Sequence, residues 1–444
     1  MNIYLVSLGC ARNLVDSEVM LGHLTEARCT IIDSPDEADV IIVNTCSFIT
    51  SAVDESIDTI LEMAEYKTKG ACRYLIVAGC LPERFREDTA DEMPEVDLFI
   101  GTGGYERIAE ELNKLLAVDG RIGKAACVLP DPNSTSPART KAPRVTTTGP
   151  LAYVKIAEGC SRHCTYCIIP ALRGKYRSRP ISDITAEAGR LIGDGVQEIN
   201  LVAESTTDYG EDLGEPGKLS EVLKALVPVV EGGWVRFLYA FPDTLDDETI
   251  ALAAREESVC AYFDIPIQHA SNEIIRKMGR SYTKEELKTL FFRLREEVPE
   301  AALRTTVIVG FPGETEAHFE ELLEFIGEVE FDHLGVFTYS DSQEQASHRL
   351  PGHVDEAVAQ ERQDRLMAAQ EEISAARNHG RVGKVYKVLV EESPEPGVYI
   401  GRTHFQAPEV DGVTFIDAED LSIGSFVNVR ITDAIVYDLS GEVV

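Results

Sequence analysis

The stretch Leu151-Ala-Tyr-Val-Lys-Ile-Ala-Glu-Gly-Cys160-Ser-Arg-His-Cys164-Thr-Tyr-Cys167 carries a short apolar segment directly into three cysteines. Its first part, Tyr153 to Ala157, is rich in the aromatic, β-branched and small residues that are typical of a buried strand. In folds that alternate strands with helices, reactive groups gather where the strands end. The stretch therefore predicts an α/β domain with a site that begins at Cys160.

Strands and helices alternate from this stretch to about Glu330. The predicted strands are Tyr153 to Ala157, Glu198 to Val202, Val235 to Leu238, Tyr262 to Ile265, Arg304 to Val309 and His333 to Thr338. Helices are predicted at Ser182 to Gly193, Leu219 to Val230 and Lys284 to Glu297. This alternation indicates a complete or partial βα barrel.

Three similar apolar runs precede this region, and each ends in a cysteine. They are Asn2 to Cys10, Ala38 to Cys46 and Arg73 to Cys80, and predicted helices follow them at Asn13 to Glu26, Ile49 to Glu65 and Pro82 to Glu92. Near-continuous apolar runs are typical of parallel strands that are covered on both faces. The pattern predicts an N-terminal, doubly wound parallel sheet.

Composition divides the remaining chain. Residues 130–150 are rich in Pro, Ser and Thr and indicate a linker or an extended crossing segment, while Val354 to His379 forms a polar predicted helix. Short strands with Gly and Pro turns then indicate a small all-β barrel. The expected domains are residues 1–129, the linker 130–150, a central domain 151–375 and a barrel 376–444.

The overall composition is globular and strongly acidic, with a formal net charge of −34 over 444 residues. Nucleic-acid binders usually carry a basic footprint, so this charge argues against direct RNA binding and favours a basic protein partner. The alternative is that the acidity only keeps the chain soluble, or that it reflects a salty cytoplasm. With no basic leader and no apolar run near the ~20 residues of a membrane span, we expect a cytoplasmic protein.

Cys160, Cys164 and Cys167 can hold a [4Fe–4S] cluster by three thiolates, which leaves one iron open. The alternative is zinc, with His163 as a fourth ligand. Structural zinc prefers paired cysteines and a closed set of four ligands, so the cluster is favoured.

Cys10, Cys46 and Cys80 form a second candidate set, since the ends of neighbouring parallel strands would bring them together. The alternative is a coincidence of three cysteines that pack in the core. Core packing is also the better interpretation of Cys29, Cys72, Cys127 and Cys260, which lack a strand-end position.

The C-x₃-C-x₂-C spacing, with Tyr166 before the last cysteine, resembles the radical S-adenosylmethionine (SAM) enzymes. The resemblance implies that the open iron chelates SAM and that reductive cleavage of SAM yields a 5′-deoxyadenosyl radical. It also implies that Tyr166 contacts the adenine.

Ser7-Leu-Gly-Cys10-Ala-Arg-Asn, Asn44-Thr-Cys46 and Ala78-Gly-Cys80-Leu-Pro-Glu, together with the later loop and barrel, resemble the methylthiotransferase family over essentially the whole chain. The resemblance implies an N-terminal methylthiotransferase domain, a central radical SAM domain and a C-terminal TRAM barrel. It also implies a second [4Fe–4S] cluster, on Cys10, Cys46 and Cys80.

Within that family, Phe237-Leu-Tyr-Ala-Phe-Pro, Asp264-Ile-Pro-Ile-Gln-His-Ala-Ser-Asn and Arg402-Thr-His-Phe-Gln-Ala-Pro-Glu-Val-Asp-Gly resemble the RimO branch. This branch methylthiolates the β-carbon of an aspartate in protein twelve of the small ribosomal subunit. Two departures, Glu204-Ser205 in place of Gln-Asp and Gln406 in place of an aspartate, put the fine substrate contacts in doubt.

The resemblance also implies SAM contacts near Glu204, which could hold the methionyl ammonium, and near Gly310, which would let the backbone approach the adenosine. His269 could line the cavity, although a structural histidine is the stronger interpretation. Expected partners are the ribosomal protein or the assembled small subunit, and an electron donor. The alternatives are a tRNA adenosine methylthiotransferase and a non-catalytic two-cluster electron carrier.

Overall fold

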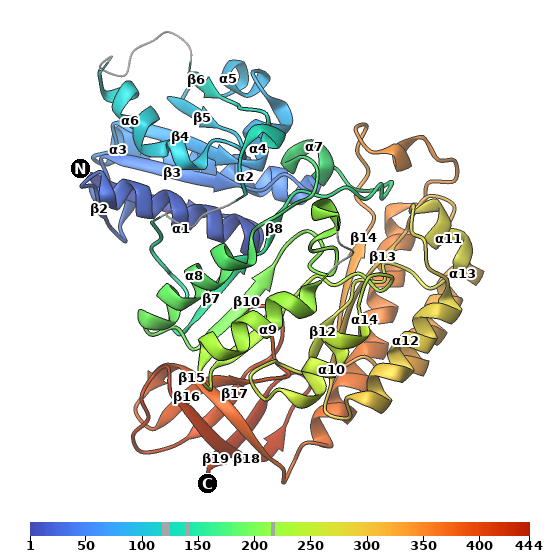
Figure 1. Cartoon of the computed structure of the whole chain (residues 1–444). Coiled ribbons are helices and arrows are strands. Elements are labelled where there is room, and N and C mark those ends of the chain that lie inside the picture. Colours follow the sequence, from blue (N-terminus) through green and yellow to red (C-terminus); the bar gives the residue numbers. More distant parts are fainter. Residues whose placement is uncertain (118–124, 138–142, 215–217) are drawn as a thin grey trace. The chain divides into compact units, whose positions relative to one another are not determined.

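The computed structural model describes residues 1–117, 125–137, 143–214 and 218–444. The chain forms two compact units (Figure 1). The first comprises residues 1–147, 157–162 and 167–183, and the second comprises residues 148–156, 163–166 and 184–444. No helix among the described residues is both long enough and apolar enough to cross a membrane.

The first unit is built on a parallel six-stranded sheet with the order β2-β1-β3-β4-β5-β6. Its strands are β1 (Asn2–Ser7), β2 (Thr30–Ile31), β3 (Val40–Thr45), β4 (Tyr74–Gly79), β5 (Leu98–Ile100) and β6 (Ala126–Val128). Its helices are α1 (Ala11–Glu26), α2 (Thr50–Ala64), α3 (Tyr66–Lys69), α4 (Cys80–Phe85), α5 (Asp88–Glu92) and α6 (Ile108–Ala117), with 3₁₀ turns η1 (Pro35–Glu37), η2 (Tyr105–Arg107) and η3 (Pro132–Ser134).

Side chains of α1 and α6 form a core on one face of this sheet, and side chains of α2, α4 and α5 form a core on the other. This arrangement confirms the doubly wound prediction. The predicted helix Pro82 to Glu92 is wrong as one element, because Arg86 has a φ of 54° and separates α4 from α5. Sequence inspection also missed β2, β5 and β6, which are too short to show a pattern.

Residues 143–147 have no regular secondary structure and contact α1. The Val145 N–H donates to the Glu18 carbonyl, and the guanidinium of Arg144 bonds the Glu18 carboxylate at 2.5 Å. The linker over residues 130–150 stays a prediction, and residues 138–142 lie outside the described chain. The unit also contains the antiparallel strand pair β8 (Ala157–Glu158) and β9 (Arg177–Ser178), with the short helix α7 (Ile169–Arg173) between them in sequence.

The second unit contains two parallel three-stranded sheets, β11-β10-β7 and β12-β13-β14, that meet where Val235 pairs with Val259. Their strands are β7 (Leu151–Lys155), β10 (Glu198–Val202), β11 (Trp234–Phe237), β12 (Tyr262–Asp264), β13 (Ala302–Val309) and β14 (His333–Thr338). The helices are α8 (Ile181–Gly193), which begins in the first unit, α9 (Leu219–Val230), α10 (Asp247–Arg255), α11 (Asn272–Lys277), α12 (Lys284–Glu297), α13 (Glu316–Val329) and α14 (Glu356–His379), with η4 (Glu211–Leu213) and η5 (Ala346–Arg349). The strands confirm the predicted partial barrel.

A closed barrel with the order β15-β16-β17-β19-β18 ends the chain. Its strands are β15 (Val385–Glu395), β16 (Val398–Thr403), β17 (Thr414–Asp417), β18 (Phe426–Ala434) and β19 (Leu439–Val443). The all-β prediction is confirmed. The predicted boundary between residues 375 and 376 falls inside α14, and the other domain boundaries stay predictions.

Candidate functional site

Three cysteines lie at the carboxyl ends of three adjacent strands in the first unit. Cys10 is the N-cap of α1 after β1, Cys46 follows β3 directly, and Cys80 follows β4 as the first residue of α4. Burial, together with the neighbouring thiols of Cys46 and Cys10, raises the pKa of the Cys80 thiol to about 12, although the Arg173 guanidinium lowers it. The fold therefore brings together the three cysteines that strand position had singled out, here called the N-terminal triad.

Gly9 allows this close approach. Its φ is 89°, and a Cβ at this position would lie 2.7 Å from the Cys46 Cβ and 3.1 Å from the Cys46 Sγ. An L-residue is strained at this φ, and any side chain would displace Cys46. The glycine before Cys10 is thus required by the triad itself.

A buried polar network fixes the loops that carry the triad. The Asn44 amide donates to the Asn13 carbonyl at 2.9 Å and to the Ser17 hydroxyl at 2.8 Å, and the Asn13 amide donates to the Leu8 carbonyl at 2.6 Å. The Thr45 hydroxyl donates to the Ala78 carbonyl at 2.6 Å. These bonds join the ends of β1, β3 and β4, so the cysteines are held by a rigid frame.

The side chains of the N-terminal triad and the charges around them suit an iron–sulfur cluster. Three thiols converge beside the N-terminus of the 16-residue helix α1 and beside the guanidinium groups of Arg12 and Arg173. Thiolate ligands and positive surroundings suit an anionic cluster. No three His, Cys, Asp or Glu side chains in the described part of the chain are placed to hold a single metal ion.

The second cysteine loop follows β7 and β8. Cys160 and Cys167 belong to the first unit, where the Cys160 N–H donates to the Gly174 carbonyl at 3.0 Å. Cys164 belongs to the second unit, where the next residue, Thr165, donates through its N–H to the Met278 carbonyl at 3.0 Å. All three cysteines are half-buried, and their donor set of three thiols within one loop suits a cluster with an open iron.

Tyr166 is buried, and its hydroxyl accepts hydrogen bonds from Nη2 of Arg280 at 2.6 Å and from Nε of Arg280 at 3.1 Å. Burial raises the pKa of Tyr166 well above its usual range. The Arg280 guanidinium also lies 4.0 Å from the centroid of the Phe241 ring. Arg280 thus fixes the orientation of the Tyr166 ring, which the family resemblance places against adenine, although no local sequence pattern marks Arg280.

Glu204 and Gly310 both follow strands of the βα sheets at their carboxyl ends. Glu204 lies two residues after β10 and is half-buried. Gly310 follows β13 with a φ of 75°, and a Cβ there would lie 2.5 Å from the Cβ of Ala359 in α14. The contact with α14 by itself explains why position 310 is a glycine. An approach of the backbone to adenosine is not needed to explain this residue.

His269 is fully buried, and its Nδ1 accepts the Ser271 N–H at 2.9 Å. Burial lowers the pKa of His269 to about 3, so the ring is neutral at ordinary pH. This environment agrees with the structural interpretation.

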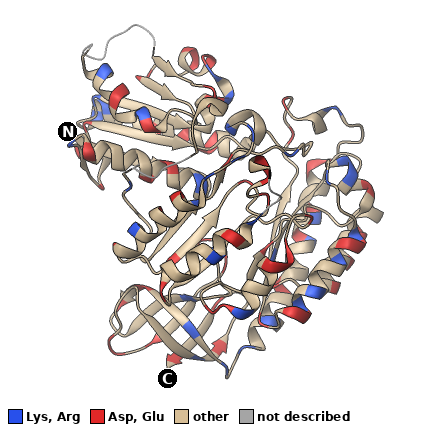
Figure 2. Cartoon of the chain, in the orientation of Figure 1, with Lys and Arg blue, Asp and Glu red and all other residues tan. Residues whose placement is uncertain are grey.

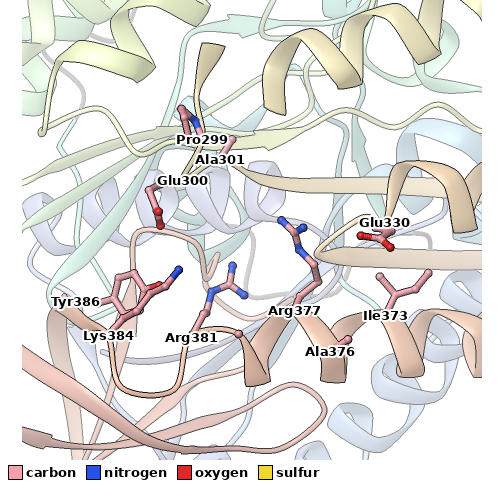
Figure 3. A pocket seen from close by; sticks show the side chains of 11 residues that line it. Pro299, Glu300, Ala301, Glu330, Ile373, Ala376, Arg377, Arg381, Lys384 and Tyr386 are labelled. Carbon is pink, nitrogen blue, oxygen red and sulfur yellow. The ribbon is translucent and has the colours of Figure 1, made fainter. Parts of the chain in front are cut away.

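The described part of the chain contains a cavity of about 400 Å³ between the end of α14 and the first barrel strand (Figure 3). Arg377 and Arg381 line it, and both bond the Asp332 carboxylate, at 3.2 and 3.0 Å. None of the lining residues belongs to either cysteine set. The cavity is thus a feature of the α14–barrel junction and not part of the candidate site.

Comparison with known proteins gives the same division of the chain. Residues 2–101 match the uncharacterized protein family UPF0004, residues 154–326 match the radical SAM superfamily, and residues 382–444 match the TRAM domain. A protein of Desulfosudis oleivorans named ribosomal protein uS12 methylthiotransferase RimO is 51% identical over 100% of both chains. The chain belongs to the RimO family. A RimO of Clostridioides difficile is 45% identical over 100% of this chain and 99% of its own.

Solved structures show the same fold at low identity. The radical SAM methyltransferase TsrM of Kitasatospora setae covers 85% of this RimO-family chain and 90% of its own, with a TM-score of 0.58 and 14% identity. The cobalamin-dependent radical SAM enzyme OxsB covers 84% of this chain and 56% of its own, with a TM-score of 0.51. Members of the RimO family are radical SAM enzymes that transfer a sulfur group, so this chain is an enzyme that uses SAM and a [4Fe–4S] cluster.

The RimO-like stretch from Arg402 to Gly412 has a structural role. Arg402 bonds Glu198 at 2.6 Å, and the carboxylate of Asp411 accepts from the Tyr262 hydroxyl at 2.6 Å, so the stretch packs where β10 and β12 begin. Gln406 is buried, and its Oε1 accepts from Thr403 and Thr414. The Gln406 departure thus lies inside the barrel, where its side chain bonds the adjacent strands β16 and β17.

Proposed function

We propose that this protein methylthiolates the β-carbon of an aspartate in ribosomal protein uS12. The observation that carries the proposal is 51% identity, over the full length of both chains, to a protein named uS12 methylthiotransferase. The three-part organisation and both cysteine sets support it, since each part of a methylthiotransferase has a counterpart here.

The roles of the residues in this proposal follow from their places in the cysteine motifs and at the ends of the strands. Cys160, Cys164 and Cys167 hold one [4Fe–4S] cluster, and the N-terminal triad holds a second. Tyr166, Glu204 and Gly310 contact SAM from the carboxyl ends of the βα strands. When bound, these groups supply the radical and sulfur chemistry, while the chain holds and orients them and excludes water.

A protein substrate is supported by the charge of the barrel. Residues 381–444 contain five Lys or Arg against eleven Asp or Glu, so few cations are available for contact with a phosphate backbone. Figure 2 marks these charges on the ribbon, and two of the arginines are held in ion pairs. Arg402 bonds Glu198 and Glu391, and Arg381 bonds Asp332. RNA-binding surfaces need free cations, so a basic ribosomal protein is the better partner. An external one-electron donor completes the set of partners.

The test combines anaerobically reconstituted protein, SAM, a reductant and either uS12 or unmodified tRNA, followed by mass spectrometry. A methylthio mass gain on an aspartate peptide of uS12 is expected. A gain on tRNA adenosine instead would keep the chemistry and overturn the substrate. SAM left intact by the reduced protein would overturn the enzymatic role and leave an electron carrier.

Replacement of the triad by alanine (Cys10→Ala, Cys46→Ala, Cys80→Ala) tests the second cluster. We expect loss of methylthiolation and loss of about half of the bound iron, with SAM cleavage retained. The matched control replaces Cys29, Cys72 and Cys127, which belong to the same unit but lie away from the triad, and it should keep all of the iron. Unchanged iron and activity in the triad variant would contradict the proposal.

A further inference from the structure

Arg173, the last residue of α7, lies beside the N-terminal triad in the first unit. The side chain is 2% exposed, and its Nη2 lies 3.7 Å from the Cys80 Sγ, within range of an N–H···S hydrogen bond. Neither cysteine motif includes Arg173, which is 93 residues from Cys80 in sequence.

Buried and half-buried acceptors orient the guanidinium of Arg173. Its Nη1 donates to the Asp16 carboxylate at 2.8 Å and to the Glu158 carboxylate at 3.0 Å, while Nη2 also reaches the Asn13 Oδ1 at 3.3 Å. The planar guanidinium is therefore held at one edge by carboxylates. The other edge remains directed at the sulfur.

The short helix α7 is itself fixed beside Cys80. Leu172 and Ile168 pack with Cys80 in a small buried apolar cluster, and the Thr102 hydroxyl donates to the Leu172 carbonyl at 2.6 Å. The backbone of Arg173 is thus positioned by the packing of α7, and its guanidinium is positioned by hydrogen bonds to the acceptors named above. Such outer contacts orient metal ligands and change the properties of the bound metal.

We propose that Arg173 is a positioning residue that donates a charge-assisted hydrogen bond to the Cys80 sulfur and raises the reduction potential of the cluster held by the N-terminal triad. The inference rests on the proposed function, because it requires that cluster. A cluster gains negative charge when it is reduced, and a buried cation bonded to a ligand sulfur stabilises that charge. Removing the bond therefore lowers the potential.

The test is a redox titration of the holoenzyme followed by electron paramagnetic resonance, with the two clusters assigned by the triad-to-alanine variant. Arg173→Lys keeps a buried positive charge but cannot bond the carboxylates and the sulfur together. Arg173→Gln combined with Asp16→Asn removes a buried charge pair as a unit, which avoids leaving Asp16 unpaired. Arg107→Gln is the control, since Arg107 pairs with Glu110 and Glu111 instead.

We expect both Arg173 variants to lower the potential of the triad cluster, to leave the other cluster unchanged and to keep the full iron content. Potentials equal to that of the wild type would overturn the inference. So would loss of the triad iron from the Arg173→Lys variant, since Arg173 would then be needed to form the site.

A measurement on the unmodified chain covers variants that fail to fold. Protein labelled with ¹⁵N-arginine should show a nitrogen hyperfine coupling to the reduced triad cluster, and absence of the coupling would overturn the inference. Iron analysis separates the two proposals. Wild-type protein that binds one cluster contradicts the proposed function, whereas two clusters with an unaltered potential contradict the role of Arg173 alone.

Discussion

Glu314 shows how much the surroundings of one side chain change its chemistry. It lies in the loop after β13, where its carboxylate accepts the Phe311 N–H at 3.1 Å and bonds the Arg362 guanidinium at 3.1 Å. Burial outweighs these contacts and raises the pKa of Glu314 to about 7. A glutamate beside an arginine is usually ionised, so here desolvation decides the protonation state.

The raised pKa of Glu314 predicts a pH-dependent stability. Between the ordinary pKa of 4.5 and the folded value of about 7, the folded chain holds a proton that the unfolded chain has lost. Stability is therefore fully present below 4.5 and falls as the pH rises through 7, by about 3 kcal/mol in total. Urea unfolding of wild type and Glu314→Gln between pH 5 and 8 should show a difference in free energy that changes with pH. A constant difference would mean that Arg362 keeps Glu314 ionised throughout.

At the scale of elements, the N-terminal triad depends on the close approach of two loops that follow neighbouring strands. The loop after β1 approaches the loop after β3 at Gly9, and the network around Asn44 holds both loops. Sequence position indicated which strands end in cysteine. The distance between the ends of these strands depends on backbone contacts that no local sequence pattern predicts.

Gly9→Ala is expected to lower the stability of the first unit by about 1–3 kcal/mol and to abolish loading of the triad with iron, because the new Cβ displaces Cys46. Iron analysis and thermal unfolding measure the two effects. Gly193→Ala is the control, since Gly193 lies at the end of α8 with nothing within 4 Å of an added Cβ, and it should be neutral or stabilising. Full iron loading in Gly9→Ala would show that the loops can separate without loss of the site.

At the scale of the whole molecule, buried ion pairs join the terminal barrel to the βα sheets within the second unit. Glu198 of β10 bonds the Arg236 Nε at 2.7 Å and the Arg402 Nη2 at 2.6 Å, and all three side chains are buried. Burial opposes ionisation of Glu198, but the guanidinium groups of Arg402 and Arg236 outweigh it and lower the pKa of Glu198 to about 2. The Glu198 carboxylate thus anchors the terminal barrel, through Arg402, on the βα sheets.

Glu198→Gln should destabilise the protein by about 3–5 kcal/mol at pH 7, because two buried cations lose their partner. The wild-type contribution is present above pH 4.5 and is lost as the pH falls through about 2, so the difference should shrink in acid. Urea unfolding of both proteins at a series of pH values measures this difference in free energy. Glu221→Gln, at an exposed site with Lys218 4.0 Å away, should stay within about 0.5 kcal/mol of the wild type.

The net charge of −34 predicts that binding of uS12 weakens as the salt concentration rises. The dissociation constant measured between low and physiological salt should increase steadily. Poly-lysine of similar length serves as a control for non-specific attraction. An affinity independent of ionic strength would show that the acidity serves solubility rather than recognition.

The sequence by itself determined the three-part organisation, the longer strands and helices, and the two cysteine sets. Apolar runs such as Val40 to Thr45 are local signals, and so is the spacing from Cys160 to Cys167. Only the tertiary structure identified Arg173, the reason for Gly310 and the anchoring role of Arg402. These depend on contacts between residues 49 to 204 positions apart, where packing and desolvation act without leaving a local pattern.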